Sequence, residues 1–287
     1  MFSNLSFKFV KRATLSVALF FISGPIVAAE KAETYKDLIE KAYNLSLQQD
    51  RAQALSILVG AAKRETHKGS APKELLSAIE EVSTVFYSDK AQQLYELALS
   101  LKQTDLALCL AKLSEASRLE PENLSIQLEI MRAMIGSGDC SGAQKMSEKI
   151  LETNPYSDQV RLHNAQSVLC LGKLEPTPFA PSDLTKNSLS LFWQQISVER
   201  MFKKAEFSEA LDLLDKMEKQ SSFYPEASYW RWKMETELKI KNEKSAQKYL
   251  ASCRKITPRQ FREFGSDPNL CRRVAEVENS LKKSHNP

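Results

Sequence analysis

The residues best suited to chemistry in this 287-residue chain are its five cysteines and three histidines. A cysteine thiolate served by a histidine base is a common enzymatic nucleophile, and Cys109 with His163 is the pair that would supply it here. Neither residue lies in a local signature of such enzymes. His67, His163 and His285 are too few and too scattered for a metal site, and the sequence contains no H-E-x-x-H, C-x-x-C or glycine-rich phosphate loop.

Two pairs of acidic residues could act as a general acid and base. Glu80 and Glu81 are adjacent, whereas Asp212 and Asp215 stand at helical spacing. Such pairs most often form the solvated face of a helix. The chain has only eight glycines, so a nucleotide-binding α/β domain is not expected either. We therefore predict a protein that is not an enzyme and that carries no cofactor.

The N-terminus has the features of an export signal. Three basic residues lie between positions 8 and 12, an apolar run follows, and Val27–Ala29 offers a small-residue cleavage site. The sequence thus predicts a signal peptide over residues 1–29 and a mature chain in the periplasm or cell envelope, or secreted. An uncleaved anchor is the alternative, but the apolar run is shorter than the roughly 20 residues of a spanning helix and contains Gly24–Pro25.

Removing the signal changes the charge balance. The whole chain has 40 Lys and Arg against 36 Asp and Glu, and three of these cations belong to the signal. The mature chain keeps 37 cations, and its net charge falls from +4 to +1. Phosphate binding requires a clustered basic face, which is not evident outside the signal. We expect neither a nucleic-acid partner nor a stable membrane span in the mature chain.

Two segments of the chain repeat a pattern 34 residues apart. Leu119–Asn123 (Leu-Glu-Pro-Glu-Asn) corresponds to Thr153–Tyr156 (Thr-Asn-Pro-Tyr). A small residue, Cys109 or Ala143, stands twelve positions before the proline of each segment. This pattern resembles the tetratricopeptide repeat, whose 34-residue helix–turn–helix unit carries W-x2-L-G-x2-Y, then A-x3-F, then P. The resemblance implies an all-α fold, a right-handed superhelical stack of antiparallel helix pairs in two blocks.

Apolar spacing and repeat phase together predict the order of the parts. We expect the signal at 1–29, a degenerate helical region at 30–90, repeats at 91–174, a Pro-rich linker at 175–183, a second repeat block at 184–258, and a C-terminal capping helix within 259–287. Pro176, Pro178 and Pro181 exclude a regular helix in the linker. The third repeat unit therefore lacks its second helix, and the capping helix is expected over 269–283.

The resemblance also implies which cysteines can pair. An exported chain can form disulfides, and in such a stack the start of one unit's second helix lies beside the end of the next unit's first helix. Cys140 and Cys170 hold these two positions, and Cys253 meets Cys271 by the same logic. We predict the disulfides Cys140–Cys170 and Cys253–Cys271, with Cys109 buried and free. Five free thiols are the alternative.

Aromatic residues and arginine, the types typical of binding hot spots, gather around Phe192–Trp193 and Tyr229–Trp232. Core packing accounts for Trp230 and Trp193. If Trp230 points inward, Arg231 and Trp232 cannot both do so. In tetratricopeptide-repeat proteins the first helices line a concave groove, and the resemblance places the following residues there: Leu128, Arg132, Gln166, Phe192, Gln195, Glu199, Phe202, Arg231, Trp232, Glu235 and Leu238.

Together these expectations favour a non-enzymatic scaffold or adaptor of the cell envelope or periplasm. It would hold a protein or peptide partner in the concave groove. One alternative is an envelope protein that binds a glycan or cell-wall ligand on Trp193 or Trp232. Another is a subunit of an envelope assembly machine. An enzyme, which would depend on Cys109, is the least favoured of these hypotheses.

Overall fold

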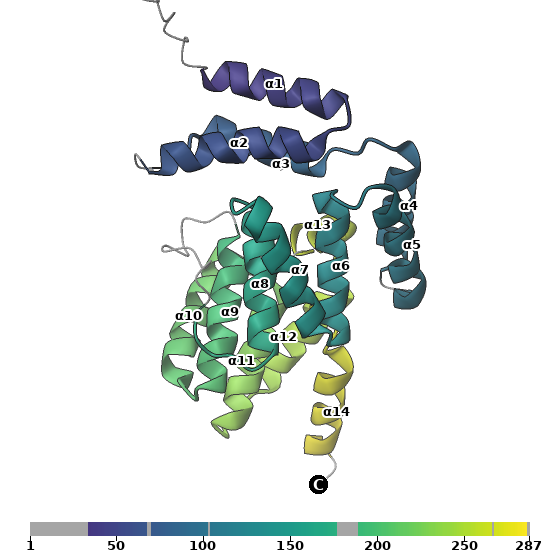
Figure 1. Ribbon diagram of the computed structural model, residues 1–287. Helices are drawn as coiled ribbons and strands as arrows, with labels where there is room; N and C mark the ends of the chain where they lie inside the picture. The colour runs from purple at the N-terminus through teal and green to yellow at the C-terminus, as the bar shows by residue number, and fades with distance from the viewer. Residues whose placement is uncertain (1–33, 68–69, 103, 177–188, 266, 286–287) are drawn as a thin grey trace, which may run out of the picture. The chain divides into compact units, whose positions relative to one another are not determined.

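The computed structural model describes residues 34–67, 70–102, 104–176, 189–265 and 267–285. Every regular element in these ranges is a helix, and most helices that follow one another in the chain pack together (Figure 1). The predicted all-α stack of helix pairs is thus confirmed. The expected signal at 1–29 lies outside the described residues, as does residue 177 onward of the expected linker. No helix in the described ranges is both long enough and apolar enough to cross a membrane.

Three helices form the N-terminal part: α1 (Tyr35–Leu47), α2 (Arg51–Thr66) and α3 (Lys73–Thr84). Thr34 and Asp37 form a capping box at the start of α1, and the Asp50 side chain caps α2. The three helices share one hydrophobic core, in which Leu58 and Ile79 are almost fully buried. Through α2 and α3 this part also contacts the helices α7 (Cys140–Thr153) and α6 (Leu124–Ser137).

The predicted repeats correspond to α4 (Asp89–Leu101), α5 (Leu106–Leu119), α6, α7 and α8 (Asp158–Cys170). The repeated sequence segments are the turns after α5 and α7. Asn123 and Ser157 cap the helices that follow, α6 and α8, by accepting backbone hydrogen bonds. Gly138 ends α6 with φ of 90°, a left-handed conformation that suits glycine. Cys109 is buried between α4 and α5, as its small size predicts.

The second block comprises α9 (Ser190–Lys203), α10 (Phe207–Gln220), α11 (Pro225–Glu237) and α12 (Glu243–Arg254). Pro225 lies in the first turn of α11, where a missing N–H is tolerated. Helix α6 contacts α8, α8 contacts α9, and α9 contacts α11. We call these four helices the first-helix layer, because each is the first helix of a predicted unit.

The C-terminal part differs from the prediction. After the short helix α13 (Pro258–Glu263), the last helix, α14 (Val274–His285), begins five residues later than expected and packs on α12. Residues Asp267–Arg273, which we call the C-terminal segment, form turns. Cys271 has φ of 55°, a left-handed conformation that interrupts a regular helix. The segment contacts the first-helix layer through side-chain hydrogen bonds.

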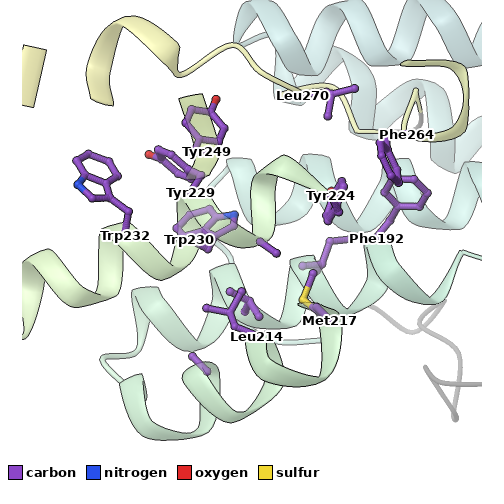
Figure 2. Packing of buried hydrophobic residues seen from close by; sticks show 14 of the residues in the cluster. Phe192, Leu214, Met217, Tyr224, Tyr229, Trp230, Trp232, Tyr249, Phe264 and Leu270 are labelled. Carbon is purple, nitrogen blue, oxygen red and sulfur yellow. The ribbon is translucent and has the colours of Figure 1, made fainter. Parts of the chain in front are cut away.

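The largest hydrophobic cluster lies in the second block and includes residues after α13 (Figure 2). The Tyr224 ring stands between Phe192 and Phe264, with centroids 6.0 and 5.1 Å away. Tyr229 lies against Trp230, Trp232 and Tyr249. The C-terminal part is therefore built into this core.

Both predicted disulfides are confirmed. Cys140 of α7 pairs with Cys170 of α8 at a Cα separation of 6.0 Å. Cys253 of α12 pairs with Cys271 of the C-terminal segment at 5.5 Å. Cys109 is free and buried. The antiparallel packing of α7 and α8 brings the first pair together, whereas the second pair joins α12 to the turns before α14.

Candidate functional site

A buried polar network joins α6 to α8 on the first-helix layer. The Arg132 Nε donates to His163 Nε2 at 3.1 Å, and its Nη2 donates to Gln159 Oε1 at 3.1 Å. Because His163 accepts through Nε2, its Nδ1 carries the proton, which it donates to Gln166 Oε1 at 2.6 Å. Burial lowers the pKa of His163 to about 3, and the charge of Arg132 adds to the effect. The imidazole is therefore neutral at physiological pH.

The network continues through Glu129 to the end of α4. The Lys102 ammonium donates to Glu129 at 2.9 Å, and Arg132 contacts the other carboxylate oxygen. Burial acts to raise the pKa of Glu129, but the charges of Arg132 and Lys102 outweigh it, so the pKa is lowered. A buried carboxylate stays ionised only where cations of this kind compensate it.

The C-terminal segment is held on the same layer of helices. Tyr224 donates its hydroxyl to Asp267 at 2.8 Å, in a buried contact. The Cys271 N–H and the Arg273 guanidinium donate to the two carboxylate oxygens of Glu226, at 2.9 and 2.8 Å. The Arg273 guanidinium also lies 4.5 Å from the centroid of the Tyr229 ring, a cation–π contact. Side chains of α11 and of Tyr224, which precedes it, thus bind a non-helical stretch of the protein's own chain through one backbone N–H and two side chains.

A cavity of about 230 Å³ lies between the C-terminal segment and helices α6, α8 and α9. Its polar lining includes Gln166 of α8, together with Gln195, Glu199 and Lys203 of α9. The Gln195 side chain is only 6% exposed, and its Oε1 has no hydrogen-bond donor among the described residues. A buried acceptor without a partner costs about 1–3 kcal/mol. We take this cavity as the candidate site.

The structure therefore brings together three of the residues predicted to bind a partner, Gln166, Gln195 and Glu199. Arg132 lies nearby, since His163 bonds to both Arg132 and Gln166.

The predicted residues on α11 and the end of α9 lie elsewhere. Arg231 pairs with Asp215 and Glu218 of α10. The Phe202 ring packs on Trp230, with centroids 5.5 Å apart. Glu235 is half-buried, and Leu238, 41% exposed, follows the end of α11.

The structure corrects the prediction of partner binding for three residues, because their side chains are buried. Leu128, Phe192 and Trp232 are 6%, 6% and 3% exposed and belong to hydrophobic clusters. For Trp232 the reason is that α11 packs against α9, α10 and α12 and also holds the C-terminal segment. A helix enclosed in this way buries side chains all around. Trp193 is buried too, so neither ring named for a glycan ligand is presented to solvent.

The thiol considered for catalysis is not activated. Burial raises the pKa of Cys109, and the charge of Glu129 adds to the rise. A reactive thiolate requires the opposite shift. The described ranges contain no group of three or more His, Cys, Asp or Glu side chains that could hold a metal ion.

Sequence reasoning missed Lys203, Glu226 and Arg273. Glu226 and Arg273 are 47 residues apart in the chain, and no repeat motif covers the C-terminal segment. The spacing of Gln195, Glu199 and Lys203 at every fourth position was the one signal available for Lys203.

The fold and the site together define an all-α helix-stack protein with a cavity on its first-helix layer. No protein-family model matches the chain, and no curated protein matches it.

Proposed function

We propose that this protein is a non-enzymatic scaffold of the periplasm or cell envelope, related in architecture to tetratricopeptide-repeat proteins, that holds a peptide or protein partner on its first-helix layer. The observation that carries the proposal is the C-terminal segment. Helix α11 and Tyr224, which precedes it, bind this turn-forming stretch through a carboxylate, a tyrosine hydroxyl and aromatic rings. The same chemistry can hold a segment of another chain.

Two further observations support the proposal. The α4–α8 and α9–α12 helices follow the pairwise order that the repeat resemblance implies. The two disulfides agree with export to an oxidising compartment. On α8 and α9 the layer also presents amide and charged side chains, which are suited to hydrogen bonding with a peptide backbone.

Site-specific photo-crosslinking in the envelope fraction of the native host tests the proposal. One probe replaces Lys203, an exposed lysine of α9 on the first-helix layer, and its matched control replaces Lys216, an exposed lysine of α10. We expect a discrete protein to be captured from position 203 and not from position 216. Equal capture from both positions, or none from 203 in folded protein with intact disulfides, would contradict the proposal.

A further inference from the structure

The C-terminal segment is tied to the surrounding helices at its end nearest α14. Cys271 is joined to Cys253 of α12 by a disulfide that closes 18 residues of chain. The Cys271 N–H and the Arg273 guanidinium both donate to Glu226 of α11, at 2.9 and 2.8 Å. Among the described residues, the bridge is the only covalent bond that joins this segment to the helices, apart from the chain itself.

The backbone at Cys271 depends on these attachments. Its φ of 55° lies in the left-handed region, which a residue with a Cβ adopts only at a cost in energy. Such a conformation persists where the surrounding structure imposes it, and here the bridge to Cys253 and the hydrogen bond to Glu226 do so. Once the bridge is open, Cys271 can return to a right-handed or extended conformation. This rotation changes the direction of the chain and separates Arg273 from Glu226.

The position of the segment determines whether the candidate cavity exists. Asp267, Pro268 and Asn269 form one wall, and Arg273 lines the cavity as well. The facing wall consists of residues of α6, α8 and α9. The segment has no helix of its own, and its internal backbone hydrogen bonds, such as that from the Arg272 N–H to the Asn269 carbonyl at 3.0 Å, span single turns. A segment of this kind can open without unfolding the helices beneath it.

Two contacts nearer the start of the segment oppose its release. Tyr224 donates its hydroxyl to Asp267, and the Leu270 side chain is buried in the core of the second block. In the chain-entropy model, closing a loop of 18 residues shifts the balance between attached and released forms by about a hundredfold. A single hydrogen bond shifts it by about tenfold at most. The bridge is therefore stronger than any one hydrogen bond of the segment, and its loss moves the balance toward release.

The second disulfide offers a matched comparison. Cys140–Cys170 joins α7 to α8, two helices that also pack against each other along their lengths. Breaking this bridge should leave both helices in place. Cys253 and Cys271 are each partly exposed, which gives a reductant access to their bridge from solvent.

We propose that the Cys253–Cys271 disulfide is a redox-controlled strap. In the oxidised chain it holds the C-terminal segment against the first-helix layer and completes the candidate cavity, and its reduction releases the segment and dismantles the cavity. The reductant is a dithiol: one thiolate attacks a sulfur of the bridge, and its second thiol then displaces the chain from the mixed disulfide. Two electrons and two protons pass to the chain, which gains two thiols, while the dithiol becomes a disulfide. Control of partner binding by the strap rests on the proposed function, whereas the strap itself does not.

Amide hydrogen exchange of the isolated chain tests the strap without any partner. In a Cys253→Ser/Cys271→Ser chain, and in the wild type reduced with dithiothreitol, the amides of residues 267–273 should exchange at least about tenfold faster. The Cys140→Ser/Cys170→Ser chain is the matched control and should keep their protection. The strap is refuted if these amides stay protected without the bridge or if the control loses protection equally. It is also refuted if exchange rises as much throughout α9–α12, because the bridge would then support the whole block.

Photo-crosslinking then separates the strap from the proposed function. The probe at position 203 should capture its protein from the wild type and from the Cys140→Ser/Cys170→Ser chain, but at least about tenfold less from the Cys253→Ser/Cys271→Ser chain, since few molecules then have the complete cavity. Equal capture from the chain without this bridge would overturn the control of binding by the strap. Absence of capture from the wild type contradicts the proposed function alone, because hydrogen exchange tests the strap in the absence of a partner.

Discussion

The Glu226 carboxylate and the Arg273 guanidinium meet at 2.8 Å and join α11 to the C-terminal segment, although Glu226 is fully buried. The second carboxylate oxygen accepts the Cys271 N–H. The residue that forms the Cys253–Cys271 disulfide is thus also fixed by a hydrogen bond to the first-helix layer. Because one carboxylate serves both contacts, its protonation state should affect the stability of this part of the fold.

The first prediction concerns the pH dependence that Glu226 causes. Burial raises the pKa of Glu226 to about 8, the nearby Asp267 adds to the rise, and Arg273 opposes it. The folded chain then keeps a proton that the unfolded chain releases above its ordinary pKa of 4.5. This contribution to stability is complete below pH 4.5 and is lost as pH rises to about 8, at up to about 1.4 kcal/mol per unit.

Urea unfolding at several pH values measures this effect. The side chain in Glu226→Gln cannot titrate. The unfolding free energy of the wild type minus that of the variant should therefore fall as pH rises from about 5 to 8. Parallel curves for the two proteins would show that the Glu226 pKa is not raised.

The second prediction concerns His163 and has the opposite sign. Its pKa is lowered to about 3 in the folded chain, whereas the unfolded chain binds a proton near pH 6.5. Stability from this residue is complete above pH 6.5 and is lost as pH falls toward 3, again at up to about 1.4 kcal/mol per unit. His163→Gln should remove that acid sensitivity. If the variant loses stability with acid as steeply as the wild type, then His163 is not the buried neutral group responsible.

Sequence reasoning succeeded where local chemistry determines the structure. The turn prolines, the small residues Cys109 and Ala143 and the pair Cys140–Cys170 all act through a helix and its nearest neighbour in the chain. Repeat phase was therefore sufficient to predict the helix stack and this disulfide. The pairing of Cys253 with Cys271 was also right, although Cys271 lies in turns and not in the helix that was expected there. The handedness of the stack and the kinship to tetratricopeptide repeats remain predictions.

Sequence reasoning was less successful where packing depends on segments that are distant in the chain. Trp232 was expected on a surface because helical periodicity assumes one buried face, and α11 has several. The C-terminal segment reaches that helix from more than 40 residues away, and its residues from Asn269 on were expected to be part of a helix. The candidate cavity needs this segment as one wall, so only Gln166, Gln195 and Glu199 could be predicted.

The third prediction concerns the disulfides. Mass spectrometry after alkylation should detect one thiol, at Cys109, and only after unfolding because this thiol is buried. The bridges close 30 and 18 residues of chain, and removing either by a double Cys→Ser substitution should cost about 3–4 kcal/mol. Cys109→Ala is the control, with an expected loss of about 1 kcal/mol. Labelling of five thiols in the exported protein would refute both pairings.

The last prediction concerns the buried ion pair that connects the N-terminal helices to the repeats. The Arg51 guanidinium of α2 lies 3.0 Å from the Glu120 carboxylate at the end of α5, and both side chains are almost completely buried. Arg51 also donates to the Val82 carbonyl at 3.2 Å, while Glu120 accepts the N–H groups of Tyr87 and Ser88. The pair thus satisfies backbone groups at the end of α3 and in the linker to α4.

Breaking one side of this pair leaves the other charge buried and alone. Arg51→Met should therefore cost about 3–5 kcal/mol of unfolding free energy, whereas Arg254→Met, which breaks the exposed pair with Glu278, should cost at most about 1 kcal/mol. In a double-mutant cycle, Arg51→Met with Glu120→Leu should cost less than the sum of the single changes. Additive losses in urea unfolding would mean that the two residues stabilise the chain independently, through their backbone contacts alone.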